Sequence, residues 1–187
     1  MNPKNYTFDF TIPQGPTGPA GPSNIRSAYL TTFNNGTISS GITIPSGERL
    51  PIDRKDIDES GLITLDPSNE TIQFNVVGYY KISFTVSAYT LHNNATFDPK
   101  TDIVSIGFKK EGTDEIYVGA SRWATDEVAI QLVGQGILSV TNIADSYVLE
   151  NVGKNNIYLH APDIQDLITT SYFSNCLVTI VIEYLGE

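Results

Sequence analysis

Few residues in this sequence combine the type and the spacing that catalysis or metal binding requires. The two histidines, His92 and His160, have no metal-binding spacing, and no Gly-X-Ser-X-Gly motif presents a nucleophilic serine. The single cysteine, Cys176, alternates in phase with apolar residues, which predicts a buried, inert thiol. No glycine-rich loop of the phosphate-binding kind occurs either. We therefore expect no catalytic residues, no cofactor and no enzymatic activity.

One acidic stretch has part of the spacing of a calcium-binding loop. Asp56, Asp58 and Ser60 offer oxygens at the first, third and fifth positions, and Gly61 follows at the sixth. The twelfth position, where such a loop carries a bidentate glutamate, is Pro67, and strands flank the stretch where helices would be needed. In a chain this acidic, paired carboxylates are typical of a solvated surface. The sequence thus predicts no metal site.

The most specific spacing in the chain is that of three glycines. Gly15, Gly18 and Gly21 recur every third residue, and proline follows each of them. This is the pattern of a collagen triple helix, in which only glycine fits at the axis where three polyproline-II chains meet. A stiff Pro/Gly-rich linker is the alternative, but a linker has no reason to keep this phase. The pattern predicts a trimer, because one strand cannot form a triple helix.

The three triplets also divide the chain. Nine residues at about 3.1 Å each span only about 28 Å, too little for a triple helix that holds together by itself. A neighbouring folded domain must therefore keep three chains in register. We expect an N-terminal connector peptide over residues 1–14, a collagen-like stalk over 15–23 and a trimerisation domain over 24–187.

The connector peptide has the alternation of a half-buried strand. Its apolar residues occupy every second position and end at a proline: Tyr6, Phe8, Phe10, Ile12 and then Pro13. A terminal strand with such a face needs a partner, either its own domain or a groove on another molecule that accepts it by strand addition. The stalk favours the second, because a rigid spacer holds the connector away from its own domain.

From residue 24 onward the sequence predicts an all-β domain. The clearest alternation of inward and outward positions runs through 80–88. Further strands are predicted over 25–33, 37–44, 62–65, 71–75, 103–109, 116–123, 128–140, 146–150, 156–160 and 172–184. About ten short strands separated by turn signals predict a sandwich or jelly roll.

Three local patterns carry further expectations. Residues 53–61 are highly charged and predict a loop, whereas Gly134 and Gly136 predict a bend within a strand. The last strand is apolar on both faces, with Val178, Ile180 and Ile182 on one and Leu177, Val181 and Leu185 on the other. It should lie centrally in its sheet, covered by the core on one face and by another layer or subunit on the other.

Composition and the first residues of the sequence limit the classes of partner and the route of export that we expect. A hydrophobic content of 40% supports a packed core, and no apolar run reaches the length of a membrane span. The net charge of -10 argues against nucleic acid and membrane surfaces, which attract clustered Lys and Arg. The first residues lack the apolar segment of a signal peptide. We expect neither nucleic acid nor membrane as a partner, and export without a classical signal.

Three segments together resemble a known family. They are Gly-Pro-Thr-Gly-Pro-Ala-Gly-Pro at 15–22, the Gly-Tyr-Tyr strand within 74–84 and the closing strand 177–185. The chain resembles the BclA-type collagen-like spore-surface proteins, whose C-terminal domain is a trimeric jelly roll like the complement globular head and TNF. The resemblance implies that fold, a spore-surface or exosporium location, and Thr17 as a carrier of O-linked sugar, with an unmodified threonine as the alternative. The family has many more triplets, and its leader anchors it to the spore coat layer.

The order of the parts leads to a functional hypothesis. We expect a structural subunit whose homotrimers join head to tail through the connector peptides into a surface fibre, with a spore-surface anchoring protein as a further partner. A contact of this kind does not close on itself and therefore propagates. The alternative is a trimeric binding or adhesion head that its N-terminal peptide anchors to a spore layer or appendage tip. A phage tail-fibre tip is a lesser alternative.

Overall fold

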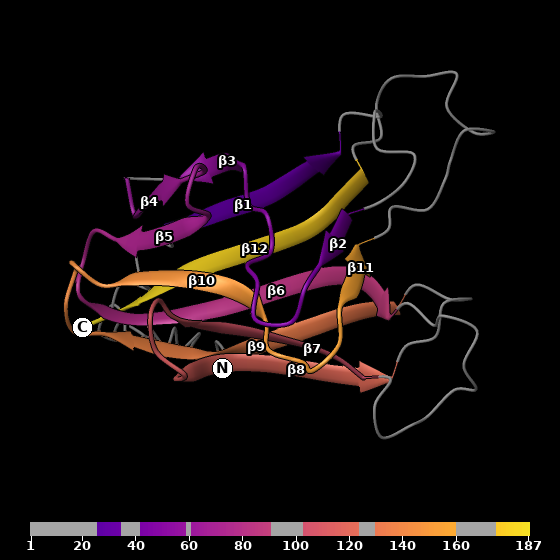
Figure 1. Cartoon of the computed structure of the whole chain (residues 1–187). Coiled ribbons are helices and arrows are strands. Elements are labelled where there is room, and N and C mark those ends of the chain that lie inside the picture. The colour runs from indigo at the N-terminus through magenta and orange to yellow at the C-terminus, as the bar shows by residue number, and fades with distance from the viewer. Residues whose placement is uncertain (1–25, 35–41, 59–60, 91–102, 124–129, 160–174) are drawn as a thin grey trace, which may run out of the picture.

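The computed structural model describes residues 26–34, 42–58, 61–90, 103–123, 130–159 and 175–187, which form two antiparallel sheets (Figure 1). Sheet A consists of β1 (Arg26–Asn34), β2 (Ile42–Ile44), β3 (Arg54–Asp58), β6 (Gly78–Thr90), β9 (Ile130–Val140), β11 (Ile157–Leu159) and β12 (Asn175–Gly186). Sheet B consists of β4 (Ile63–Asp66), β5 (Thr71–Phe74), β7 (Ile103–Lys110), β8 (Ile116–Trp123) and β10 (Ser146–Asn151).

Strand β6 organises sheet A. Along one edge it pairs with β9, from Gly78↔Val140 to Ala88↔Ile130. Along the other edge it pairs first with β12 and then with β11. Beyond β12 the sheet continues through β1 to β3, and β2 extends it beyond β11. Sheet B has the order β4-β5-β10-β7-β8.

The core lies between the two sheets, and the alternation of β6 supplies its centre. Tyr80, Ile82, Phe84, Val86 and Ala88 are all buried, which confirms the prediction for 80–88. They meet buried side chains of sheet B, which include Ile72, Phe74, Ile106, Phe108 and Leu149. Burial of a side chain of this size contributes about 1.5–3 kcal/mol, so these inward positions stabilise the sandwich.

The last strand occupies the centre of sheet A, as its two apolar faces predicted. β12 pairs with β1 on one side and with β6 on the other. Val178, Ile180 and Ile182 are buried in the core. On the other face Leu177 is buried, Val181 is half-buried and Leu185 is exposed, so the cover that one chain supplies decreases toward the end of the strand.

Two local predictions were wrong. The charged stretch expected as a loop contains strand β3, which pairs with β1 through Tyr29↔Ile57 and Thr31↔Arg54. Its four charged residues suit an edge strand that must not pair with other molecules, and they hid the strand from a search for apolar residues. Gly134 and Gly136 make no bend, because the register of β9 with β6 is uninterrupted. Instead, the missing side chain of Gly134 leaves space for the ring of Phe84, and that of Gly136 leaves space for Val118.

A fully buried asparagine ties loops to the sandwich. The side-chain amide of Asn151 donates to the carbonyl oxygens of Ile44 at 3.2 Å, Pro45 at 3.1 Å and Asn155 at 2.8 Å. Its oxygen accepts the N–H of Gly153 at 3.1 Å. Because every hydrogen-bonding group of the amide has a partner, this polar residue fixes the chain at β2 and after β10 without an unpaired group.

The two ends of the sandwich differ. The C terminus lies at the left-hand end in Figure 1, where β1 begins and β6 begins. The last described residues of β1, β6, β8 and β11 reach the opposite end. No helix occurs among the residues described, and hence none there could span a membrane.

Candidate assembly face

The outward side of sheet A is the surface that one chain leaves uncovered. Strand alternation and register fix which residues point outward from β1, β6, β9 and β12. We call these residues the assembly face: Ser27, Tyr29, Thr31, Tyr79, Lys81, Ser83, Thr85, Ser87, Tyr89, Gln131, Val133, Gln135, Ile137, Ser139, Thr179, Val181 and Glu183.

The assembly face carries almost no charge. Lys81 and Glu183 are its only charged residues, although the chain contains 21 acidic and 11 basic residues. They lie directly opposite each other in β6 and β12, and Lys81 Nζ is 2.7 Å from Glu183 Oε2. Charge therefore cancels within the face, and a molecule that covered it would bury no unpaired charge.

Large apolar side chains are exposed on the same side of the sheet. Val133 and Ile137, both in β9, expose 64% and 56% of their surface. At the other edge of the sheet Ile57 is 52% exposed and lies opposite Tyr29. Between these edges the face presents mainly hydroxyl groups and Val181. Apolar residues set among uncharged polar ones, with charge excluded, are typical of the buried part of a protein interface.

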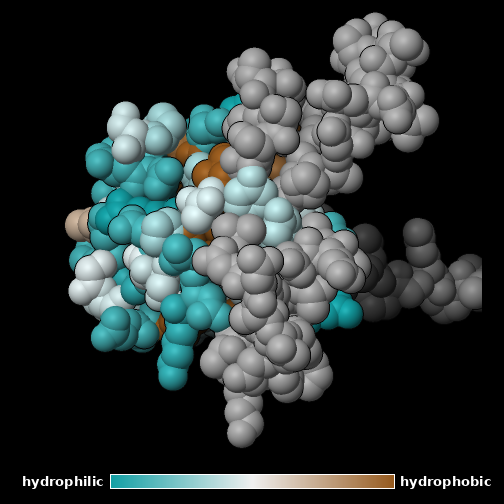
Figure 2. Space-filling view, turned by 45° about the vertical axis from the view of Figure 1, so that its right-hand side comes forward, coloured by the Kyte–Doolittle hydropathy of each residue, from teal (hydrophilic) through white to brown (hydrophobic). Residues whose placement is uncertain are grey.

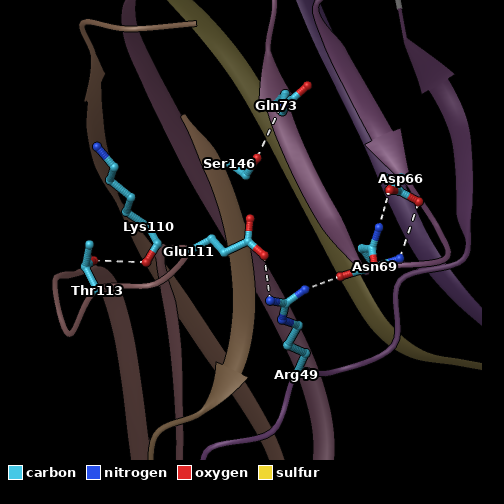
Figure 3. Close-up of polar contacts among 8 residues, drawn as sticks. All are labelled: Arg49, Asp66, Asn69, Gln73, Lys110, Glu111, Thr113 and Ser146. Carbon is cyan, nitrogen blue, oxygen red and sulfur yellow. Dashed lines mark hydrogen bonds and ion pairs between the residues drawn. The ribbon is translucent and has the colours of Figure 1, made fainter. Parts of the chain in front are cut away.

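The outer side of sheet B has the opposite character. Ion pairs join Arg49 to Glu111 at 2.6 Å, Lys109 to Glu150 at 2.8 Å and Lys110 to Asp145 at 2.7 Å. Figure 3 shows the guanidinium of Arg49 between the Glu111 carboxylate and the Asn69 carbonyl oxygen. In Figure 2 the described part of the visible surface is mainly hydrophilic. These ion pairs lie away from the assembly face, whereas the pair of Arg54 with Asp56 borders it beside Thr31.

Two polar hollows of about 240 Å³ each lie among these charged residues. One is lined by Thr64, Asp66, Asn69, Thr71, Gln73, Glu111 and Ser146. Its groups mostly bond to one another: Gln73 donates to the Ser146 hydroxyl at 3.2 Å, and the Asn69 side chain donates to Asp66 at 2.7 Å. That bond from Asn69 lowers the pKa of Asp66, which keeps it a carboxylate. The arrangement offers a solvated surface network.

The carboxylates of the partial calcium spacing are engaged elsewhere. Asp56 accepts the Thr31 hydroxyl at 2.6 Å and pairs with Arg54. Asp58 accepts the N–H of Leu62 at 2.6 Å and pairs with Lys55 at 2.7 Å. Within the described residues no group of three or more His, Cys, Asp or Glu is arranged to hold a metal ion.

The residues that sequence analysis assigned to assembly lie outside the described part of the chain. These are the connector residues Tyr6, Phe8, Phe10, Ile12 and Pro13, the stalk glycines Gly15, Gly18 and Gly21, and Thr17. His92, His160 and the side chain of Cys176 also lie outside it. The stalk, the connector and the domain boundaries therefore stay predictions.

Sequence analysis did not find the assembly face. One signal for it was present in the best-predicted strand, whose outward positions include Ser83, Thr85 and Ser87. Hydroxyl residues in a row are unusual on an open face of so acidic a chain, where Asp and Glu would keep the molecule soluble. The exposed residues of β9 gave no such signal, because their position beside β6 depends on the strand order.

Comparison with known proteins was made by sequence and by structure. No protein-family model matches the chain, and no curated protein matches its sequence. Among solved structures, the Eiger TNF of S. frugiperda has a TM-score of 0.57 at 11% identity, over 87% of this chain and 94% of that one. Murine APRIL at pH 5.0 has a TM-score of 0.52 at 9% identity, over 87% of this chain and 100% of that one.

The globular domain of zebrafish complement 1qA matches equally well. Its TM-score is 0.52 at 10% identity, over 88% of this chain and 99% of that one. At such low identities the likeness establishes the fold alone. The predicted fold class is therefore confirmed for the domain: it is an all-β jelly roll of the TNF and C1q globular-head type.

Proposed function

We propose that this protein is a homotrimeric structural subunit of a surface fibre, and that the assembly face joins the three heads. The observation that carries the proposal is the near absence of charge on that face in a chain of net charge -10. Three such chains repel one another unless their acidic groups point away from the contact. The outward charges of sheet B and the internal pair of Lys81 with Glu183 meet this condition.

Threefold symmetry is supported by the stalk glycines. Gly15, Gly18 and Gly21 suit a triple helix, which needs three chains, yet the triplets are too few to hold three chains together. A head that associates through sheet A supplies the missing stability. The resemblance to collagen-like spore-surface proteins implies the same arrangement, a trimeric jelly roll at the end of a collagen-like segment.

Fibre growth depends on the connector. Three apolar connector strands would leave each stalk together, and each would add to the next trimer as a heterologous contact that does not close. Such a fibre belongs on a spore surface or exosporium, with an anchoring protein at its base. It needs no catalysis, cofactor, nucleic acid or membrane.

Native mass spectrometry of the full chain tests the trimer. We expect a trimer for the natural sequence and monomers for Val133→Lys, which places a charge on the β9 side of the assembly face. Because this change reduces the net negative charge, dissociation would result from burying the charge and not from stronger repulsion. Ile116→Lys is the matched control, since Ile116 is 47% exposed but belongs to sheet B. Monomers from the natural sequence would overturn the proposal.

Electron microscopy separates the fibre from the trimer. The full chain should form filaments, and the chain without residues 1–13 should form single trimers. Filaments that survive the deletion would exclude the connector as the joint between trimers.

A second candidate function, a binding or adhesion head, is favoured by one observation. β1, β6 and β8 all end at the same end of the sandwich, away from Arg26, the first described residue (Figure 1). This end would be the tip of a stalked head, where a partner could reach it. This function predicts trimers that remain discrete at high concentration.

A further inference from the structure

One of the two polar hollows lies over β7, β8 and β10 on the outer side of sheet B, and we call it the sheet B hollow. It has a volume of about 240 Å³, and its lining includes Ser46, Lys109, Asp114, Ile116, Glu150 and Val152. A drug-sized ligand needs a cavity of about 300–1,000 Å³. The sheet B hollow therefore suits a ligand of about one ring.

An ion pair with little access to water lines the sheet B hollow. Lys109 Nζ lies 2.8 Å from Glu150 Oε1, and the two side chains expose only 11% and 15% of their surface. In each of the other ion pairs that the described residues form, at least one side chain is more exposed than either of these two. The register explains the contact, because Glu150 pairs with Gly107, the neighbour of Lys109 on the outer side of β7.

Most of the hydrogen-bonding capacity of this pair is left over by the protein. An ammonium group has three donors and a carboxylate accepts about four hydrogen bonds. Within the described part of the chain, the only hydrogen bond of either group is the one between Lys109 and Glu150. Polar groups that water reaches so little need other partners. A ligand with several hydroxyl groups could donate to the carboxylate and accept from the ammonium without separating the two charges.

Apolar side chains form a wall beside the ion pair. Ile116 is 47% exposed, and Val152 is half-buried. A Cβ built on Gly107 would lie 3.0 Å from Cγ1 of Val152 and 3.2 Å from Cγ2 of Ile116, so the two side chains are neighbours above this glycine. An apolar surface next to a few convergent polar groups is typical of a small-molecule site.

The charges of the sheet B hollow argue against other classes of ligand. Its lining holds one positive charge, that of Lys109, and two negative charges, those of Asp114 and Glu150. A phosphate or carboxylate would meet both acidic groups and a lysine that is already paired. A metal ion would lack ligands, since no group of three His, Cys, Asp or Glu suited to one occurs among the residues described. An uncharged, hydroxyl-rich ligand remains.

We propose that the sheet B hollow binds one pyranose ring of an uncharged glycan. The C–H face of the ring packs on Ile116 and Val152, and two adjacent hydroxyl groups bond to Lys109 and Glu150. Each sugar hydroxyl both donates and accepts, which matches an ammonium donor beside a carboxylate acceptor. Because the ligand is neutral, the ion pair stays intact and neither charge is left unpaired.

The other polar hollow lacks these features. Its polar groups bond to one another, as Gln73 does with Ser146 and Asn69 with Asp66. No aliphatic or aromatic residue is among those that line it. It therefore serves as the control site.

This inference goes beyond the proposed function and does not rest on it. The sheet B hollow lies on the opposite side of the sandwich from the assembly face, so it stays open whether the chain is a monomer or a trimer. In a trimer, three such sites would bind a surface that carries many copies of the glycan more tightly than one site does.

Saturation-transfer difference NMR of the full chain tests the site. The probes are the methyl glycosides of glucose, galactose, mannose and N-acetylglucosamine, with N-acetylneuraminic acid as the anionic probe. We expect transfer to the ring C–H protons of at least one neutral glycoside, with a Kd of about 1 mM. N-Acetylneuraminic acid should receive about tenfold less, because it meets two carboxylates. Absence of transfer to all four glycosides, or equal transfer to the acid, would overturn the proposal.

Two variants locate the binding. Lys109→Met with Glu150→Leu removes both charges together, and Ile116→Ser removes the apolar wall at an exposed position where folding should not suffer. Each should lower the transfer about fivefold, since it removes one of the two kinds of contact. Gln73→Ala with Ser146→Ala, in the other hollow, is the matched control and should leave the transfer unchanged. Full transfer in Ile116→Ser, or an equal loss in the control, would remove the glycan from the sheet B hollow.

Native mass spectrometry of the same samples separates this site from the proposed assembly. Trimers that show no transfer would refute the glycan site alone. Monomers that show transfer, with the loss in Ile116→Ser, would support the site and refute the assembly.

Discussion

The ring of Phe84 lies directly against the backbone of Gly134 in the neighbouring strand. The two residues are partners across the ladder of β6 and β9, and a Cβ built on Gly134 would lie 2.2 Å from Cζ of Phe84. Glycine at this position lets the largest side chain in the middle of β6 remain in the core while β9 keeps its regular pairing. The contact also sets the position of Val133, the most exposed apolar residue of the assembly face.

Gly134→Ala should lower the free energy of unfolding by about 2 kcal/mol, because Phe84 must move within a packed core. Urea unfolding monitored by circular dichroism measures the change. Gly119→Ala is the control: the nearest atom to a Cβ there is 3.6 Å away, and we expect little effect. Combining Gly134→Ala with Phe84→Leu should cost less than the sum of the two changes, whereas strict additivity would contradict the contact.

Asn151→Ala should cost about 3 kcal/mol, since it removes the buried amide that donates to the carbonyl groups of Ile44, Pro45 and Asn155. The midpoint of urea unfolding reports the loss. Asn142→Ala removes an exposed amide that bonds to Asp145 and should change stability by about 0.5 kcal/mol. Similar losses in the two variants would mean that the buried amide does not hold the loops.

The ion pair on the assembly face predicts a reversal between single and double variants. Lys81→Met leaves Glu183 unpaired in a contact that excludes water, and it should shift the oligomer strongly toward monomers. Lys81→Met with Glu183→Leu removes both charges and should restore the trimer. Sedimentation velocity at several concentrations measures the equilibrium. A double variant as dissociated as the single one would place the pair outside the contact.

Alkaline pH should destabilise the head through Tyr80. Burial, together with the neighbouring Tyr184, raises the pKa of Tyr80 from 10.0 to about 12, and its hydroxyl donates to the Val76 carbonyl oxygen at 2.6 Å. Between about pH 10 and about pH 12, Tyr80 loses its proton in the unfolded chain but keeps it in the folded chain. The folded state then binds more protons, so stability falls as pH rises. The stability that the protonated Tyr80 hydroxyl contributes is complete below about pH 10 and is lost toward about pH 12.

Melting temperatures across this range test the role of Tyr80. Tyr80→Phe should lower stability at neutral pH by about 1 kcal/mol and flatten the alkaline decline. Part of the decline should remain, because the pKa of Tyr117 is raised to about 12 and that of Tyr147 is raised as well. An unchanged decline in Tyr80→Phe would assign the whole effect to the other tyrosines.

Glu70→Gly should stabilise the turn between β4 and β5 by about 1 kcal/mol. Glu70 has a φ of +55°, a left-handed conformation that costs a residue with a Cβ about 1–2 kcal/mol. Burial also raises the pKa of its carboxyl group, so the charged form is disfavoured there. Differential scanning calorimetry would detect the expected rise in melting temperature. Glu48→Gly, at a neighbouring exposed position with no left-handed strain, should bring no gain.

Local alternation was enough to predict the β class, the strand over 80–88 and the central position of the last strand. In each case the residues themselves carry the pattern, such as Tyr80 to Ala88 alternating with polar neighbours. The sequence-based prediction failed where a residue in the neighbouring strand decides the local structure. Taken alone, Gly134 predicts a bend. Only the ring of Phe84 in the adjacent strand shows that this glycine makes room for a core side chain.

The candidate site depends still more on distant neighbours. Lys81 and Glu183 are about a hundred residues apart in sequence, and no local pattern says that they pair. The same holds for Lys109 and Glu150 in the sheet B hollow. Sequence analysis could foresee that the last strand needed a cover on its outer face, but not which residues surround it.

The place of β12 has a consequence for biosynthesis. β12, the last of the described strands in chain order, lies between β1 and β6, so sheet A stays open until that strand has been synthesised. A chain that ends prematurely lacks the link between its first strand and the rest of the sheet, and it has no finished surface to offer its neighbours. Truncation ahead of residue 175 should therefore leave β1 and β6 each with an open edge, a form that is prone to mispairing.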